Sequence, residues 1–212
     1  LITQKSLNHR VYKVLMAKSW RKDPTAPTRI EADQIVEIFE EKEEEYKLEN
    51  LYTRSVILVN NPKKIVPLNV GNIATRVIQV GAKRFIDFEK NIELYTNLKP
   101  TYLKPDAEKP LPSIYKKRKQ QPLILCINNA LINLRRDTTF IQSINRQSQQ
   151  SPVVIVNYGS PMHLKAFDPS VAIIQSFENN KAIRQHIAQL IFGGTTAQGK
   201  LPLALATHLS YA

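Results

Sequence analysis

The side chains that could carry catalysis are few and lack the spacing that catalysis uses. None of the four histidines lies near another histidine or a cysteine at metal-ligand spacing: His9, His163, His186 and His208. Ser160 lies in Tyr158-Gly159-Ser160-Pro161, which differs from the GxSxG elbow of serine hydrolases. Pro161 also lacks the N–H that an oxyanion hole would use there. We therefore predict no catalytic, cofactor-binding or metal-binding residues in this chain.

Three other patterns could bind phosphate or react, and each has a simpler structural interpretation. Val80-Gly81-Ala82-Lys83 follows a predicted strand, but its single glycine indicates a turn and no phosphate-binding loop. Lys116-Lys117-Arg118-Lys119 has no interleaved aromatic residues that could stack on bases, so we interpret it as a solvated surface run. Cys126 lies within an apolar run and is predicted to be an unreactive core thiol.

Carboxylates are scarce in the second half of the chain. After residue 109 there are only Asp137, Asp168 and Glu178, against 11 lysines and arginines. General acid–base catalysis needs a carboxylate or another titratable group positioned at the reacting bond. This half therefore has little equipment of its own for bond cleavage.

Short apolar runs predict the strands that would position these side chains. Five runs are β-branched and continuous, which is typical of strands buried on both faces: Val56–Val59, Arg76–Val80, Leu123–Ile127, Val153–Val156 and Val171–Ile174. Helical stripes lie between them, and the clearest, Ile183 to Ile191, is followed by Gly193-Gly194 as a helix stop. The alternation predicts an α/β fold: a doubly wound, mainly parallel five- or six-stranded sheet with helices on both faces, preceded by a helical linker.

The residues before the sheet predict two helices and a boundary between them. Leu7, Val11, Val14 and Leu15 form one helical stripe, which ends before the proline-rich segment Asp23–Pro27. Thr28-Arg29-Ile30-Glu31 has capping-box spacing and predicts a second helix. The acidic run Glu40–Glu45 is interpreted as a solvated face of that helix, and Lys104–Lys119 as a crossing of uncertain structure.

Length and composition limit the class of protein. The chain has 212 residues, 42% hydrophobic and 23% charged, which suits one well-filled core and excludes collagen, low-complexity disorder and coiled coil. No stretch approaches the roughly 18 to 20 apolar residues of a membrane span. The single cysteine cannot form an internal disulfide. Because the chain starts at Leu1, we expect that a functionally important segment precedes it.

Three segments, in this order, resemble the C-terminal α/β domain of glycoside hydrolase family 3. Ser55–Asn61 followed by Ile65–Leu68 is similar to the first strand of that domain. Pro152–Val156 through Pro161 is similar to its strand and turn with the pattern PVVVV and G.P. Ile187–Gly194 followed by Gly199-Lys200-Leu201-Pro202 is similar to its closing LFG and GKLP motif. Asn60 departs from the usual Lys, and Phe177–Ala182 replaces a glycine-rich segment.

The resemblance implies a division of the chain into three parts. Residues 1–22 correspond to the terminal helix of a TIM-barrel domain that is otherwise missing from this sequence, since Leu7–Trp20 resembles that helix. Residues 23–53 correspond to a linker and helix, and residues 54–212 to the C-terminal α/β domain. In the family the barrel carries the catalytic Asp nucleophile, so no residue of this chain inherits that role.

The resemblance also indicates which branch of the family fits better. In β-glucosidase-like members a Glu on the C-terminal domain is the acid/base, which a retaining mechanism needs about 5 to 5.5 Å from the nucleophile. Glu178 is the only glutamate after residue 109, and it lacks that loop context. In β-N-acetylglucosaminidases an Asp–His pair on the barrel does this work. The implied function is a non-catalytic domain of a bacterial β-N-acetylglucosaminidase that acts on cell-wall-type glycans in the periplasm or cell envelope.

The implied partners are the barrel of the same parent protein and, through it, a carbohydrate. Two alternatives stay open. The net charge of +12 would suit a stand-alone basic module that binds nucleic acid or an anionic wall polymer, although charge alone makes nucleic acid a weak expectation. Asn60 and the missing glycines would suit a scaffold domain that has lost the catalytic role of its family.

Overall fold

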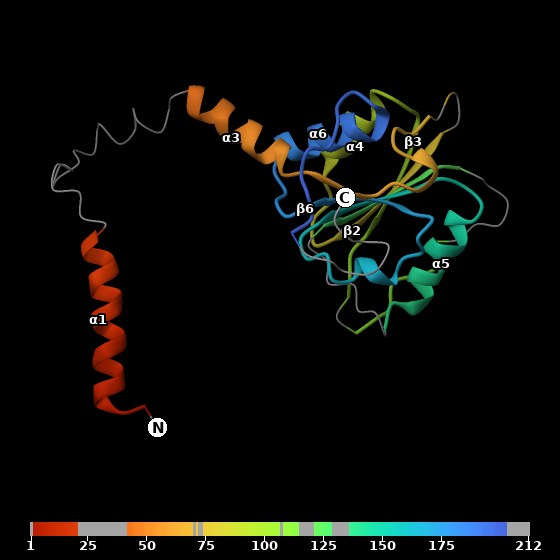
Figure 1. Cartoon of the computed structure of the whole chain (residues 1–212). Coiled ribbons are helices and arrows are strands. Elements are labelled where there is room, and N and C mark those ends of the chain that lie inside the picture. The colour runs from red at the N-terminus through yellow and green to blue at the C-terminus, as the bar shows by residue number, and fades with distance from the viewer. Residues whose placement is uncertain are drawn as a thin grey trace. The chain divides into compact units, whose positions relative to one another are not determined.

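The computed structural model describes residues 2–20, 42–69, 71, 74–106, 108–114, 121–128 and 136–202, with only the backbone of 42–45 (Figure 1). The chain divides into two compact units, residues 1–45 and 46–212. The predicted capping box at Thr28–Glu31, the basic run Lys116–Lys119 and His208 lie outside the described residues, as do all side chains of the acidic run Glu40–Glu45.

The first unit contains helix α1 (Gln4–Trp20), where the sequence predicts a helix. No residue of α1 is buried. Its stripe of Leu7, Val11, Val14 and Leu15 is 46 to 58% exposed, and Trp20 is 81% exposed. The helical spacing is confirmed, and the apolar face is uncovered among the described residues of this unit.

The second unit is built on a six-stranded sheet. Its strands are β1 (Ile57–Asn60), β2 (Thr75–Gly81), β3 (Leu98–Leu103), β4 (Leu123–Asn128), β5 (Val153–Tyr158) and β6 (Ala172–Ser176). Their order is β1-β6-β5-β4-β2-β3, and every neighbouring pair is parallel except β1 with β6. The predicted mainly parallel sheet is confirmed.

Helices cover both faces of this sheet, as predicted (Figure 1). The helices are α3 (Lys42–Arg54), α4 (Ile86–Glu93), α5 (Thr138–Ser148) and α6 (Lys181–Phe192), with short 3-10 turns at Pro62–Lys64 and Leu164–Ala166. Successive strand residues point to opposite faces. Val154 and Val156 pack in the cluster with α4 and α6, whereas Val153 and Ile155 pack in the cluster with α5.

Strand β3 is the one strand that the sequence analysis missed. It lies at the edge of the sheet, where its middle residues Lys99, Pro100 and Thr101 are exposed. An edge strand has one side open to solvent, so it needs no continuous apolar run. Proline is tolerated there because the outer side has no neighbouring strand that needs its missing N–H. The apolar pattern that predicted the other five strands is therefore absent from β3.

Helix α6 ends as its glycines predict. Gly193 has a left-handed φ of 84°, and its N–H donates to the carbonyl oxygens of Gln189 and Leu190. None of the described helices is both long enough and apolar enough to cross a membrane.

Candidate functional site

The strand order reverses between β2 and β4, the place where doubly wound folds usually bind ligands. β2 ends at Gly81 and β4 at Asn128, and the two residues are paired in register. A Cβ on Gly81 would lie 2.6 Å from the carbonyl oxygen of Asn128. The glycine of Val80-Gly81-Ala82-Lys83 is thus explained by close packing between strand ends: it is the last residue of β2, and the chain bends after it at Ala82 and Lys83.

A hollow of about 450 Å³ opens at this edge of the sheet, between the beginnings of α4 and α6. Arg184 on α6 donates from Nε to Asp87 Oδ2 of α4 at 2.9 Å and from Nη1 to Asn179 Oδ1 at 2.8 Å. Its guanidinium also lies 4.6 Å from the ring centroid of Phe85. Asn179 in turn donates to Asn128 Oδ1 at 2.6 Å. These polar groups are engaged with one another and hold the two helices together.

The three carboxylates after residue 109 are dispersed. Asp137 is fully buried, and its Oδ1 accepts from the backbone N–H of Leu111 at 3.0 Å and from Arg136 Nε at 3.2 Å. Asp168 accepts from the N–H of Ser170 in the loop before β6. Glu178 is exposed after β6. Asp137 and Asp168 thus stabilise loops, and the structure gives no pair of these carboxylates in one hollow.

The described histidines and Cys126 also lie apart. His9 is exposed on α1, whereas His163 is buried and its Nε2 has no hydrogen-bond partner. Burial lowers the pKa of His163 to about 4 and raises the pKa of the buried Cys126 thiol, so neither is charged at neutral pH. Among the described residues, no three His, Cys, Asp or Glu side chains are grouped so that they could hold a metal ion.

The turn at Gly159-Ser160-Pro161 closes β5. Asn157 donates to the carbonyl oxygen of Ser160 at 3.1 Å, and Gln175 of β6 donates to that of Gly159 at 2.7 Å. Gly159 has a φ of 121°, which favours glycine. Buried amide side chains thus fix this segment as a strand-ending turn.

The first and last segments of the family resemblance pack against each other. The N–H of Gly199 donates to the carbonyl oxygen of Val56 at 3.0 Å, and a Cβ on Gly199 would lie 2.7 Å from Ile57 Cγ1. The N–H of Leu68 donates to the carbonyl oxygen of Ile191 at 2.6 Å. These contacts fasten the segment after α6 to the beginning of β1, and the segment after β1 to the end of α6.

Asn60, which stands where the family usually has Lys, is also structural. Its Nδ2 donates to the carbonyl oxygens of Pro169 at 2.9 Å and Val171 at 2.8 Å. The amide thereby fastens the end of β1 to the segment that leads into β6.

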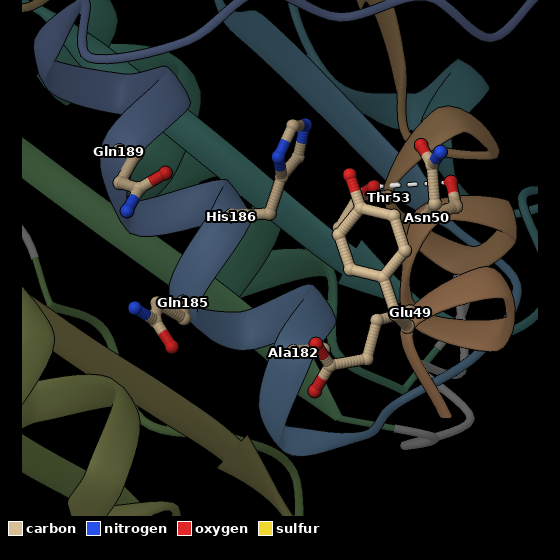
Figure 2. Close-up of a pocket in the computed structure, with 8 residues that line it drawn as sticks. Glu49, Asn50, Thr53, Ala182, Gln185, His186 and Gln189 are labelled. Carbon is tan, nitrogen blue, oxygen red and sulfur yellow. Dashed lines mark hydrogen bonds between the residues drawn. The ribbon is translucent and has the colours of Figure 1, made fainter. Parts of the chain in front are cut away.

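A second hollow, of about 320 Å³, lies between α3 and α6 (Figure 2). Helix α6 lines it with Ala182, Gln185, His186 and Gln189, and α3 with Tyr46, Glu49, Asn50 and Thr53. In Figure 2 the labelled side chains of α6 and α3 lie on opposite sides of the hollow. We call it the α3–α6 groove.

The sequence analysis did not predict the α3–α6 groove. A usable signal was present, because α3 carries polar groups at i, i+3, i+4 and i+7 and α6 at i+3, i+4 and i+7 after Ala182. A polar stripe on a single helix, however, is usually its solvated face. Only the tertiary structure shows that the two stripes share one hollow.

No protein-family model matches the sequence, and a search of curated proteins finds no match either. Solved structures do match the fold. A β-glucoside phosphorylase has a TM-score of 0.63 and 18% identity, with 96% of this chain and 39% of that chain covered. A glycoside hydrolase family 3 β-N-acetylglucosaminidase from Paenibacillus has a TM-score of 0.59 and 14% identity, with 97% and 40% covered.

A fungal multi-domain glycoside hydrolase family 3 β-N-acetylglucosaminidase matches with a TM-score of 0.59 and 17% identity, over 78% of this chain and 20% of that chain. The chain thus spans about 20 to 40% of the length of these proteins. Identities this low establish likeness of fold. The resemblance read from the sequence is confirmed at that level: the chain has the mainly parallel α/β fold that forms part of solved glycoside hydrolase family 3 proteins.

Proposed function

We propose that this chain is the C-terminal, non-catalytic domain of a bacterial glycoside hydrolase family 3 enzyme of the β-N-acetylglucosaminidase type. One observation carries the proposal. The fold match covers 96 to 97% of this chain but only 39 to 40% of two solved proteins, so a comparable protein would have a large additional part. The domain packs against a catalytic barrel that contacts the carbohydrate.

The carboxylates support this division of labour. Asp137 is buried in a hydrogen-bonded network and Asp168 stabilises a turn, so both have structural roles. Glu178 is exposed. Among the described residues, its hydrogen bonds join its backbone to the Ser176 hydroxyl, and none leads to a second carboxylate. Glycoside hydrolysis uses two carboxyl groups on either side of the scissile bond. A second domain would supply them.

The uncovered helix α1 supports the proposed domain boundaries. Its exposed apolar stripe suits a helix that belongs to a neighbouring domain, here residues 1–22 as the last helix of the barrel. Residues 23–53 form the linker with its helix, and residues 54–212 the α/β domain. An enzyme acting on cell-wall-type glycans would work in the periplasm or cell envelope.

The test compares the parent protein with this chain. Both are purified and assayed for hydrolysis of an aryl β-N-acetylglucosaminide and an aryl β-glucoside. We expect the parent to cleave the former and the 212-residue chain to cleave neither. Turnover by the chain alone would contradict the division of labour, and a parent that prefers the glucoside would contradict the branch. An inactive parent with a degenerate barrel would favour the scaffold alternative.

A further inference from the structure

The α3–α6 groove differs from an ordinary contact between two helices. Its lining residues follow i, i+3, i+4 and i+7 spacing on both helices, so each set forms one helix face. Such a face between neighbouring helices is normally apolar and closes the gap by interlocking side chains. Here seven of the eight side chains carry a polar group, and a hollow of about 320 Å³ remains. Helix packing does not account for this stripe.

The polar groups of the groove are available for a ligand. Among the described residues, the side chains of Glu49, Asn50, Gln185 and Gln189 make no hydrogen bond or ion pair. Nε2 of His186 is shielded from solvent and has no partner either. Burial lowers the pKa of His186, which favours the neutral ring that donates at one nitrogen and accepts at the other. Amides likewise donate and accept.

The charge of the groove selects the kind of ligand. Of the described residues that line it, Glu49 is the only charged one, and none is a lysine or an arginine. Phosphate groups and nucleic acids are bound through cationic side chains. The groove is therefore unsuited to the anionic polymers that the net charge of +12 would attract. A neutral molecule with several hydroxyl groups matches its donors and acceptors.

Tyr46 adds an apolar platform to the groove. Tyr46 is 68% exposed, so its aromatic face is open to a ligand. A pyranose ring has an apolar C–H face and a rim of hydroxyl groups, which corresponds to an aromatic face surrounded by amides. The hollow also reaches the size of small-molecule pockets, which begin at about 300 Å³.

We propose that the α3–α6 groove binds a neutral oligosaccharide, with a sugar ring against Tyr46 and its hydroxyl groups bonded to Asn50, Gln185 and Gln189. The choice of a glycan among polyhydroxyl ligands rests on the proposed function. The groove would hold a glycan chain without cleaving it, because cleavage uses two carboxyl groups and Glu49 supplies the single carboxylate among the described lining residues.

The experiment uses the whole 212-residue chain, labelled with ¹⁵N and titrated with the trimer of β-1,4-linked N-acetylglucosamine in an NMR experiment. We expect chemical-shift changes concentrated in residues 46–54 and 181–192. Tyr46→Ala should weaken binding about tenfold, the equivalent of about 1.4 kcal/mol. Gln185→Ala and Gln189→Ala together should weaken it to a similar extent. Tyr12→Ala is the matched control, since Tyr12 is a 61%-exposed tyrosine on α1 and should leave binding unchanged.

Two results would overturn the inference: no saturable shifts in α3 and α6 at millimolar trimer, or unchanged affinity in Tyr46→Ala. Binding that Tyr12→Ala weakens as much as Tyr46→Ala would overturn it as well. This test and the hydrolysis test fail separately. A parent enzyme that cleaves its substrate while this chain binds no trimer refutes only the groove, and a chain that binds while the parent is inactive refutes only the proposed function.

Discussion

Helix α6 has two neighbouring helices, and its two sides are built differently. Toward α4, Phe192 stacks on Tyr95 with ring centroids 4.7 Å apart and planes at 9°, and Arg184 pairs with Asp87. Toward α3, the same helix presents the amides of Gln185 and Gln189 to an open hollow. Aromatic and ionic contacts cross the α4 side, although a hollow remains where the two helices begin. The lining residues of the α3 side are mostly polar, and their hollow is unfilled.

The difference shows which part of the helix sequence serves folding. Residues on the α4 side and toward the sheet are explained by packing, because changing them would leave cavities or unpaired groups. The α3 side gains no comparable packing, so its polar stripe needs another explanation. Substitutions on the two sides should therefore differ sharply in their effect on stability.

The largest contrast is expected between Ile92→Ala on α4 and Gln189→Ala on α6. Ile92 is fully buried, so its truncation leaves a cavity and should lower the free energy of unfolding by about 3 to 4 kcal/mol. Gln189 lines the open groove and its replacement should change stability by less than about 0.5 kcal/mol. Urea denaturation measures both. Equal losses would remove the contrast between the two sides.

Lowering the pH should destabilise the folded chain because His163 is buried. Burial lowers the pKa of His163 to about 4, below its ordinary value of 6.5. Between pH 6.5 and about 4 this histidine is protonated in the unfolded chain but still neutral in the folded chain. The free energy of unfolding therefore falls as the pH falls through this range, by up to about 3 kcal/mol in total.

Denaturation at several pH values should show this loss, and His163→Gln should reduce it. If that variant does not fold, NMR titration of the His163 ring in the wild-type chain gives the same information. A His163 ring that titrates near 6.5 would contradict the prediction. His186, beside the open groove, should contribute a smaller part because it is less buried.

Gly199→Ala should disturb the place where α3 runs into β1. Its new methyl group would lie 2.7 Å from Ile57 Cγ1 and 2.8 Å from the carbonyl oxygen of Val56, which the backbone must move to relieve. We expect a loss of about 2 kcal/mol. Gly194→Ala is the control, because its nearest neighbour would be at 3.4 Å. Similar melting temperatures for the two variants would show that this close approach is unimportant.

The smallest of these effects is expected for Arg184→Ala on the α4 side. The variant loses the pair with Asp87 and the bond to Asn179, but Asp87 is 37% exposed and water replaces part of the contact. We expect a loss of about 1.5 kcal/mol. Arg54→Ala removes one long, exposed bond to Gln198 and should cost less. If Arg54→Ala lowers the free energy of unfolding as much as Arg184→Ala does, the ion pair between Arg184 and Asp87 contributes little to the packing of α4 against α6.

Much of the fold could be predicted because burial leaves a local trace. The run Val153–Val156 is apolar at every position since both faces of β5 are covered, and Gly193 marks the end of α6 since it adopts a left-handed φ. Strand β3 could not be predicted in this way. Its exposed residues and Pro100 give no apolar run, and its strand geometry depends on pairing with β2.

The candidate sites were less predictable than the fold. The bond between Asn128 and Asn179 joins residues 51 positions apart, and no local pattern distinguishes these asparagines from loop residues. In the groove, the spacing of Gln185 and Gln189 was visible, but their relation to Glu49 and Asn50 depends on how α3 lies along α6. The sequence shows the types of these side chains, but it does not show which of them lie close together.

The amino-acid order alone determined the α/β class, the positions of five strands and the shortage of carboxylates in the second half, because these follow from local periodicity and composition. The tertiary structure decided that Asp137 is buried in a network, that Gly199 fits against β1 and that two polar helix faces enclose one hollow. Each of these is a contact between residues far apart in the chain, and such contacts arise only when the sheet brings their elements together.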